Sequence, residues 1–140
     1  MKTLVFVCNW DGWSCINAAS AADGCRRPDV NLIKLTCLSA FNAGMALRAF
    51  EHGADGALVL GCKNDQCQHG TYGDHVEREL ARARELLDLA GVDSNRLVFT
   101  RLDAFDARGY AEALAGLDKR VSGLAAMPGT GLPPAGGPGC

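Results

Sequence analysis

Four short apolar segments alternate along the chain with longer segments in which apolar residues recur every three or four positions. The apolar segments span residues 3–8, 30–36, 57–62 and 97–100. Short apolar runs of this kind predict strands, and the helical period between them predicts helices. The alternation of strand and helix along the chain therefore predicts an α/β protein.

The helices are expected at about residues 14–23, 41–52 and 74–90, with a fourth that ends near residue 124. A glycine follows each of the first three, and glycine is a common residue for ending a helix. The last two helices each carry one apolar stripe. The stripes consist of Val76, Leu80, Ala83, Leu87 and Ala90, and of Tyr110, Leu114, Leu117, Val121 and Leu124.

The predicted strands are apolar at almost every position, as expected for a parallel sheet that helices cover on both faces. We therefore expect an α/β fold with a small doubly wound parallel sheet of flavodoxin-like type, with strand order 2-1-3-4. Residues 1–122 would form one domain. Residues 123–140 are rich in Gly and Pro, and we expect a flexible tail or a partner-binding arm there.

Charge and hydropathy limit the classes of partner. The chain has 140 residues, a formal net charge of −2 and no run of Lys or Arg, which argues against nucleic acid or an anionic membrane surface as a partner. No apolar run reaches the roughly 20 residues of a membrane span, and the first residues lack the pattern of a signal peptide. We expect a cytoplasmic protein without membrane insertion.

The seven cysteines carry the candidate chemistry. In a reducing compartment, metal ligation, redox chemistry or burial are more plausible uses of cysteine than a disulfide framework. The carboxyl ends of parallel strands share one edge of the sheet, where such folds place their sites. Five cysteines are expected there: Cys8 and Cys62 at strand ends, Cys37 just after a strand, Cys67 in the following loop, and Cys15 in the first turn of a helix.

Four thiolates suit a [2Fe-2S] cluster or zinc. Iron-sulfur is favoured because these ligands would come from the ends of core strands and not from tight loop pairs. The helix starts at that edge would supply N–H groups that stabilise negative charge. Cys25, a helix length away from the edge, is interpreted as a packing residue, and Cys140 in the tail as adventitious.

Other chemistries fit less well. A Rieske centre needs two histidine ligands, and the loop offers one suitable residue, His69. A phosphatase loop of the C-x5-R type fails because Ser14 stands at the arginine position. Binding of the phosphate group of a flavin at the helix starts remains an alternative. Trp10 and Trp13 fit three roles equally: core packing, a shield for a cluster, or a partner surface.

The segments "VCNW", "KLTC", "GADGALVLGCKNDQCQHGTYG" and "AGVDSNRLVFTRLDAFDARGYAE" resemble the delta subunit family of methyl-viologen-reducing hydrogenase, over about residues 3–122. The resemblance implies a [2Fe-2S] protein that passes electrons between a hydrogenase or dehydrogenase module and the flavin-containing A-type component of heterodisulfide reductase, often in electron-bifurcating complexes. It also implies four ligands, Cys8, Cys37, Cys62 and Cys67.

One residue departs from the family pattern. The family's first motif reads C-N-W-C, and here Asp11 stands in the place of its second cysteine. Either the cluster does without that thiol or Cys15 replaces it. The resulting hypothesis is a non-catalytic electron-transfer subunit of an oxidoreductase complex. The alternative is an assembly module, with zinc or without a cofactor, that docks redox subunits.

Overall fold

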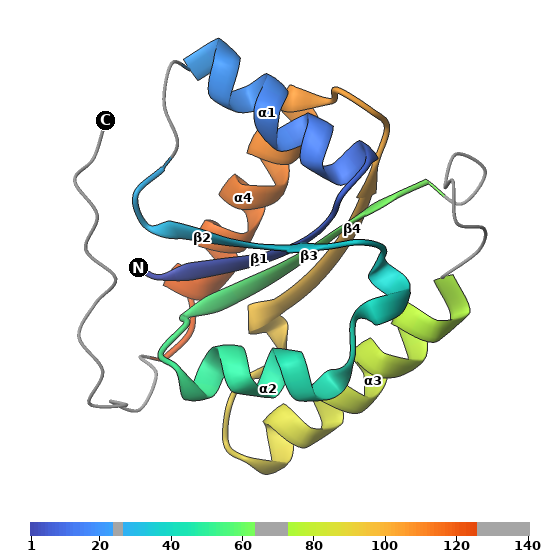
Figure 1. Cartoon of the computed structure of the whole chain (residues 1–140). Helices are drawn as coiled ribbons and strands as arrows, with labels where there is room; N and C mark the ends of the chain where they lie inside the picture. The colour runs from blue at the N-terminus through green and yellow to red at the C-terminus, as the bar shows by residue number, and fades with distance from the viewer. Residues whose placement is uncertain (24–26, 64–72, 126–140) are drawn as a thin grey trace.

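A single parallel sheet forms the centre of the molecule (Figure 1). The structure, a computed structural model, describes residues 1–23, 27–63 and 73–125. The strand order is β2-β1-β3-β4, and all three neighbouring pairs are parallel. The predicted fold class and strand order are confirmed. The strands are β1 (Thr3–Cys8), β2 (Val30–Leu35), β3 (Gly56–Cys62) and β4 (Leu97–Leu102).

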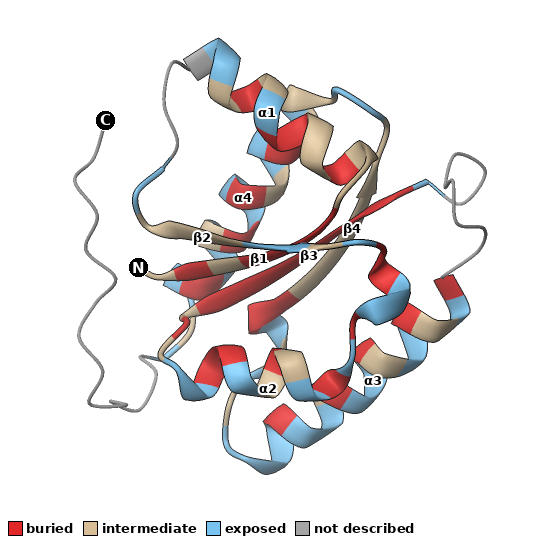
Figure 2. Cartoon of the chain, in the orientation of Figure 1, coloured by how far each residue is buried: buried red, intermediate tan, exposed pale blue. Residues whose placement is uncertain are grey.

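Helices cover both faces of the sheet (Figure 1). α1 (Asp11–Asp23) and α4 (Ala107–Ser122) lie on one face, and α2 (Ala43–Glu51) and α3 (Gly73–Leu89) lie on the other. Successive side chains of a strand point to opposite faces, so each central strand contributes to two cores. The central strands are the most deeply buried elements (Figure 2).

The two cores hold different cysteines. The core under α2 and α3 contains Phe6 and Val59 together with Cys8, Cys37 and Cys62. The core under α1 and α4 contains Val5, Val7, Leu58, Leu60 and Cys15. Four of the five candidate ligands therefore have a described position. Three of them share one face of the sheet, and Cys15 lies on the other face.

Two of the predicted helix stops are confirmed by backbone geometry. Gly53 and Gly91 have φ of 93° and 84°, values that glycine adopts without steric cost. The start of the second helix was predicted two residues early, at Phe41. It begins at Ala43 because the side chain of Asn42 accepts a hydrogen bond from the Met45 N–H and caps the helix.

The first helix begins three residues before its predicted start, at Asp11 and not at Ser14. Only two residues separate it from β1, and the Ser14 hydroxyl donates a hydrogen bond to the Asp11 carbonyl oxygen at 2.7 Å. Cys15 therefore lies in the second turn of α1, and its predicted place in the first turn was wrong.

Several predicted features fall outside the described residues: the helix stop at Gly24, the packing role of Cys25, the loop residues Cys67 and His69, and the tail beyond residue 125 with Cys140. Within the part that is described, none of the helices has both the length and the apolar character that crossing a bilayer requires.

Candidate metal centre at the carboxyl edge of the sheet

Two predicted ligands touch at the carboxyl edge of the sheet. The Sγ atoms of Cys8 and Cys62 lie 3.2 Å apart, and these residues are 2% and 1% exposed. A disulfide would require about 2.05 Å, and both residues are free cysteines. They end neighbouring strands, β1 and β3, so the pairing of these strands brings the sulfurs together.

The start of α1 directs backbone N–H groups at both sulfurs. The Gly12 N–H donates to the Cys8 Sγ at 3.2 Å. The Trp10 N–H also faces Cys8, and the Asp11 N–H faces Cys62. These N–H groups belong to the positive end of the helix dipole, which favours negative charge on sulfur.

The start of α1 packs so closely against the sheet and the Cys8 sulfur that position 12 has no room for a side chain. A Cβ atom at this position would lie 2.9 Å from Val7 Cγ2, 3.0 Å from the Leu60 carbonyl oxygen and 3.1 Å from the Cys8 Sγ. Gly12 was not among the site residues predicted from the sequence. The available signal was a glycine four residues after a strand-end cysteine, at the point where the chain turns into a helix.

The sulfur contact favours one thiolate in the pair. A hydrogen bond from the Cys62 thiol, together with the Trp10 and Gly12 N–H groups, lowers the pKa of Cys8 to about 6, although burial acts in the opposite direction. The same hydrogen bond and burial raise the pKa of Cys62. The contact therefore favours a state with one thiolate and one thiol in the pair, and thiolate is the form of cysteine that binds metals.

Cys37 is the third predicted ligand on this side of the sheet. It is buried, it belongs to the same core as the pair, and it follows β2 at the start of the short 3-10 turn Leu38–Ala40. Among the described residues no group of three or more His, Cys, Asp or Glu side chains is close enough together to hold a metal ion. The expected fourth ligand, Cys67, is outside those residues.

The sulfur pair itself is compatible with a metal. Two thiolates on one tetrahedral ion, each at about 2.3 Å, would be about 3.8 Å apart. Cys8 and Cys62 stand at 3.2 Å. They would therefore need to separate by about 0.6 Å to share an ion. The burial, the thiolate and the surrounding N–H donors all suit a sulfur-ligated centre.

Cys15 lies apart from that core. It is buried in the core beneath α1 and α4, and its thiol donates a hydrogen bond to the Asp103 carbonyl oxygen at 3.0 Å. Burial raises the pKa of this thiol. A neutral, hydrogen-bonded thiol in an apolar core is the arrangement expected of a packing residue.

Trp10 and Trp13 both contribute to core packing, one of the three roles expected for them. Both are half-buried: Trp10 packs on the core that holds Cys8, and Trp13 packs on the core beneath α1 and α4. Lys34 lies over the Trp13 ring, with its Nζ 4.4 Å from the ring centroid. Both tryptophans also line a surface groove of about 520 Å³ beside the start of α1.

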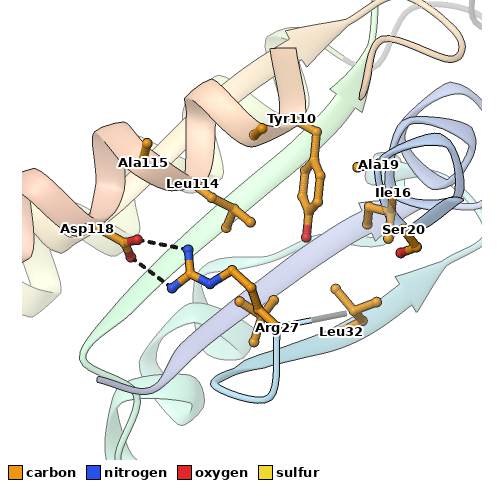
Figure 3. A pocket seen from close by; sticks show the side chains of 11 residues that line it. Ile16, Ala19, Ser20, Arg27, Leu32, Tyr110, Leu114, Ala115 and Asp118 are labelled. Atoms are coloured by element: carbon orange, nitrogen blue, oxygen red, sulfur yellow. Dashed lines mark hydrogen bonds and ion pairs between the residues drawn. The ribbon is translucent and has the colours of Figure 1, made fainter. Parts of the chain in front are cut away.

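A separate cavity of about 150 Å³ lies between α1, α4 and β2 (Figure 3). The Tyr110 side chain extends from α4 along this cavity, and the Arg27 guanidinium pairs with Asp118 at 2.8 Å. Arg27 also pairs with Asp29 at 2.5 Å. Since two carboxylates already neutralise the guanidinium, the cavity is poorly suited to bind an anion.

The cysteine-bearing domain has recognisable relatives. A family model described as methyl-viologen-reducing hydrogenase, delta subunit, matches residues 3–125, a range that contains all the strands and helices found in the described residues. The chain belongs to this family. The family resemblance seen in the sequence is thereby confirmed.

Two similar proteins are both named as the D-type iron-sulfur subunit of the F420-non-reducing hydrogenase vhu. The one from Methanocaldococcus jannaschii is 28% identical over 125 residues, and the one from Methanococcus maripaludis is 29% identical over the same length. In both cases the match covers 89% of this chain and 93% of the relative.

A third relative is much longer. It is the A-type subunit of the ferredoxin:CoB-CoM heterodisulfide reductase of Methanosarcina mazei. It is 24% identical over 120 residues, which make up 84% of this chain but only 15% of that protein. A segment similar to this delta-subunit domain is thus part of a larger polypeptide in that organism.

Proposed function

We propose that this chain is an electron-transfer subunit that carries one [2Fe-2S] cluster on Cys8, Cys37, Cys62 and Cys67. The observation that carries the proposal is the buried contact between the Cys8 and Cys62 sulfurs, with backbone N–H groups directed at both. The relatives named iron-sulfur subunits support the iron-sulfur chemistry.

The proposed partners are a heterodisulfide-reductase-A-type flavoprotein and a hydrogenase, dehydrogenase or reductase module, in a cytoplasmic and electron-bifurcating complex. Relatives named as hydrogenase subunits, and the relative named as the A-type subunit of a heterodisulfide reductase, support these two classes of partner. The chain itself would convert no substrate.

The residues of this chain would have separate tasks. A bound iron-sulfur cluster accepts and releases single electrons. Cys8 and Cys62 would ligate it, and the N–H groups of Trp10, Asp11 and Gly12 would donate to sulfur. Hydrogen bonds to sulfur and exclusion of solvent are two of the factors that set a cluster's reduction potential. The start of α1 is therefore where this chain would tune its potential.

Metal analysis of protein purified without oxygen tests the proposal. We expect about two irons and equal sulfide per chain, with an S = ½ EPR signal after reduction by dithionite. Cys62→Ser should remove most of the iron and the visible absorption. One zinc per chain, no metal at all, or normal iron in Cys62→Ser would contradict the proposal, and the first two results would support an assembly role.

A further inference from the structure

A groove opens at the same edge of the sheet as the sulfur pair. Its volume is about 520 Å³, and its walls are the start of α1 and the loop between β4 and α4, which pass beside each other in Figure 1. Trp10 lies in its lining, two residues after Cys8, and the Trp10 N–H faces the Cys8 sulfur. The groove and the sulfur pair therefore share one turn of backbone.

Phe105, which forms part of this lining, has both an exposed side chain and an uncommon backbone conformation. Its side chain is 75% exposed to solvent. Its φ of 62° places it in the left-handed region, and among the described residues it is the one non-glycine with positive φ. A bulky residue in this region is strained. Burial of the ring within this chain does not offset that strain.

Hydrogen bonds hold Phe105 in this position. Its N–H donates to the Ser14 Oγ at 2.9 Å, and the Ser14 hydroxyl in turn donates to the Asp11 carbonyl oxygen at 2.7 Å. On the other side, the Asp106 side chain accepts from the Gly109 N–H at 2.8 Å and caps α4. These hydrogen bonds hold the backbone of the loop on both sides of Phe105, so the residue is kept at the groove.

The charge of the groove indicates what kind of surface would fit it. Asp11 is the charged residue among the described residues of this lining, and Lys34 lies beside it, with its Nζ over the Trp13 ring. A complementary surface would offer an apolar pocket for Phe105 and a cationic side chain for Asp11.

We propose that this groove is the docking surface for the flavoprotein partner, with Phe105 as its anchor. The inference rests on the proposed function. Buried aromatic side chains commonly provide most of the binding free energy of an interface. An occupant of this groove would contact the backbone turn whose N–H groups face the sulfur pair, and it would therefore lie beside the proposed cluster. The heterodisulfide-reductase-A relative that contains a similar segment supports a partner of this class.

Affinity measurements with the purified flavoprotein test this surface. In the full-length chain, Phe105→Ala should weaken binding at least about tenfold. Leu89→Ala is the matched control, because Leu89 is 79% exposed and lies at the last residue of α3, outside the groove lining. It should change the affinity less than about twofold.

One further variant keeps the test independent of folding, and a second tests the charge of the groove. Phe105→Gly removes the ring and suits the positive φ, so it should fold at least as well as wild type and bind as weakly as Phe105→Ala. Asp11→Lys should weaken binding, and the loss should diminish as salt concentration rises. Full affinity in both Phe105 variants, or no binding by the wild-type chain, would overturn the proposal.

Iron content separates this proposal from the proposed function. The Phe105 variants should keep the iron and the EPR signal of the wild type. Normal iron with unchanged affinity would refute the docking surface alone. Absence of iron in the wild type, combined with weakened binding in Phe105→Ala, would refute the electron-transfer function and leave a docking surface of an assembly module.

Discussion

Replacing Gly12 with alanine is the most direct test of how the sulfur pair is built. The added methyl would meet Val7 Cγ2 at 2.9 Å and the Leu60 carbonyl oxygen at 3.0 Å. Both atoms belong to the central strands β1 and β3, which are fixed by pairing on both sides. The start of α1 must therefore move away, and this movement lengthens the hydrogen bond from the Gly12 N–H to the Cys8 sulfur.

The cost can be estimated from the separate contributions. Forcing an extra methyl into a packed region costs about 1–3 kcal/mol. Loss of a hydrogen bond to a charged group costs about 1.5–3 kcal/mol, and here only part of it would be lost. The higher helix propensity of alanine returns at most about 1 kcal/mol. We expect Gly12→Ala to lower the free energy of unfolding by about 1–3 kcal/mol.

Urea unfolding of the reduced, metal-free protein measures this change. Gly116→Ala in α4 is the matched control, because a Cβ there meets no atom within 4 Å. That variant should be more stable than wild type by about 0.5–1 kcal/mol. If Gly12→Ala were as stable as wild type, the close packing of α1 against the sulfur pair would be refuted.

Two further predictions concern the thiols. The pKa of Cys8 is about 6 in the folded protein, whereas the pKa of an unfolded cysteine is about 8.5. Between these two pH values the unfolded state therefore binds more protons than the folded state. The stability of the metal-free protein should therefore rise with pH across that interval. Above that interval stability should fall, because Cys62 keeps its proton in the folded protein and loses it in the unfolded chain. Urea midpoints measured across the pH range would show both changes. A stability that does not vary with pH would contradict the hydrogen bond between the two sulfurs. Cys15→Ala should reduce stability by about 1–2 kcal/mol through the lost packing and hydrogen bond, without changing the iron content. Loss of iron in that variant would instead identify Cys15 as a ligand.

Much of the fold could be predicted because the signals are local and agree with one another. β1 was predicted with its observed bounds, Thr3–Cys8, since a continuous apolar run ends there. Gly53 and Gly91 marked helix ends because few other residues adopt positive φ without cost. The contact between Cys8 and Cys62 follows from the strand order, which places β1 beside β3.

Other features depend on contacts that a local pattern does not contain. The early start of α1 was missed because glycine and tryptophan are not strong helix formers. What determines that start is the packing of Gly12 against two strands and the N–H groups directed at sulfur. The left-handed Phe105 had no sequence signal either, since "AFD" lacks the glycine or asparagine usual at positive φ.

The distance along the chain between the two touching cysteines has a consequence for biosynthesis. Cys8 and Cys62 are separated by 54 positions, and they meet only after β1 and β3 have paired. A chain emerging from the ribosome with β1 alone presents a single thiol. Capture of a cofactor by this pair would therefore come after the central sheet has assembled, so that loading selects chains that have already folded.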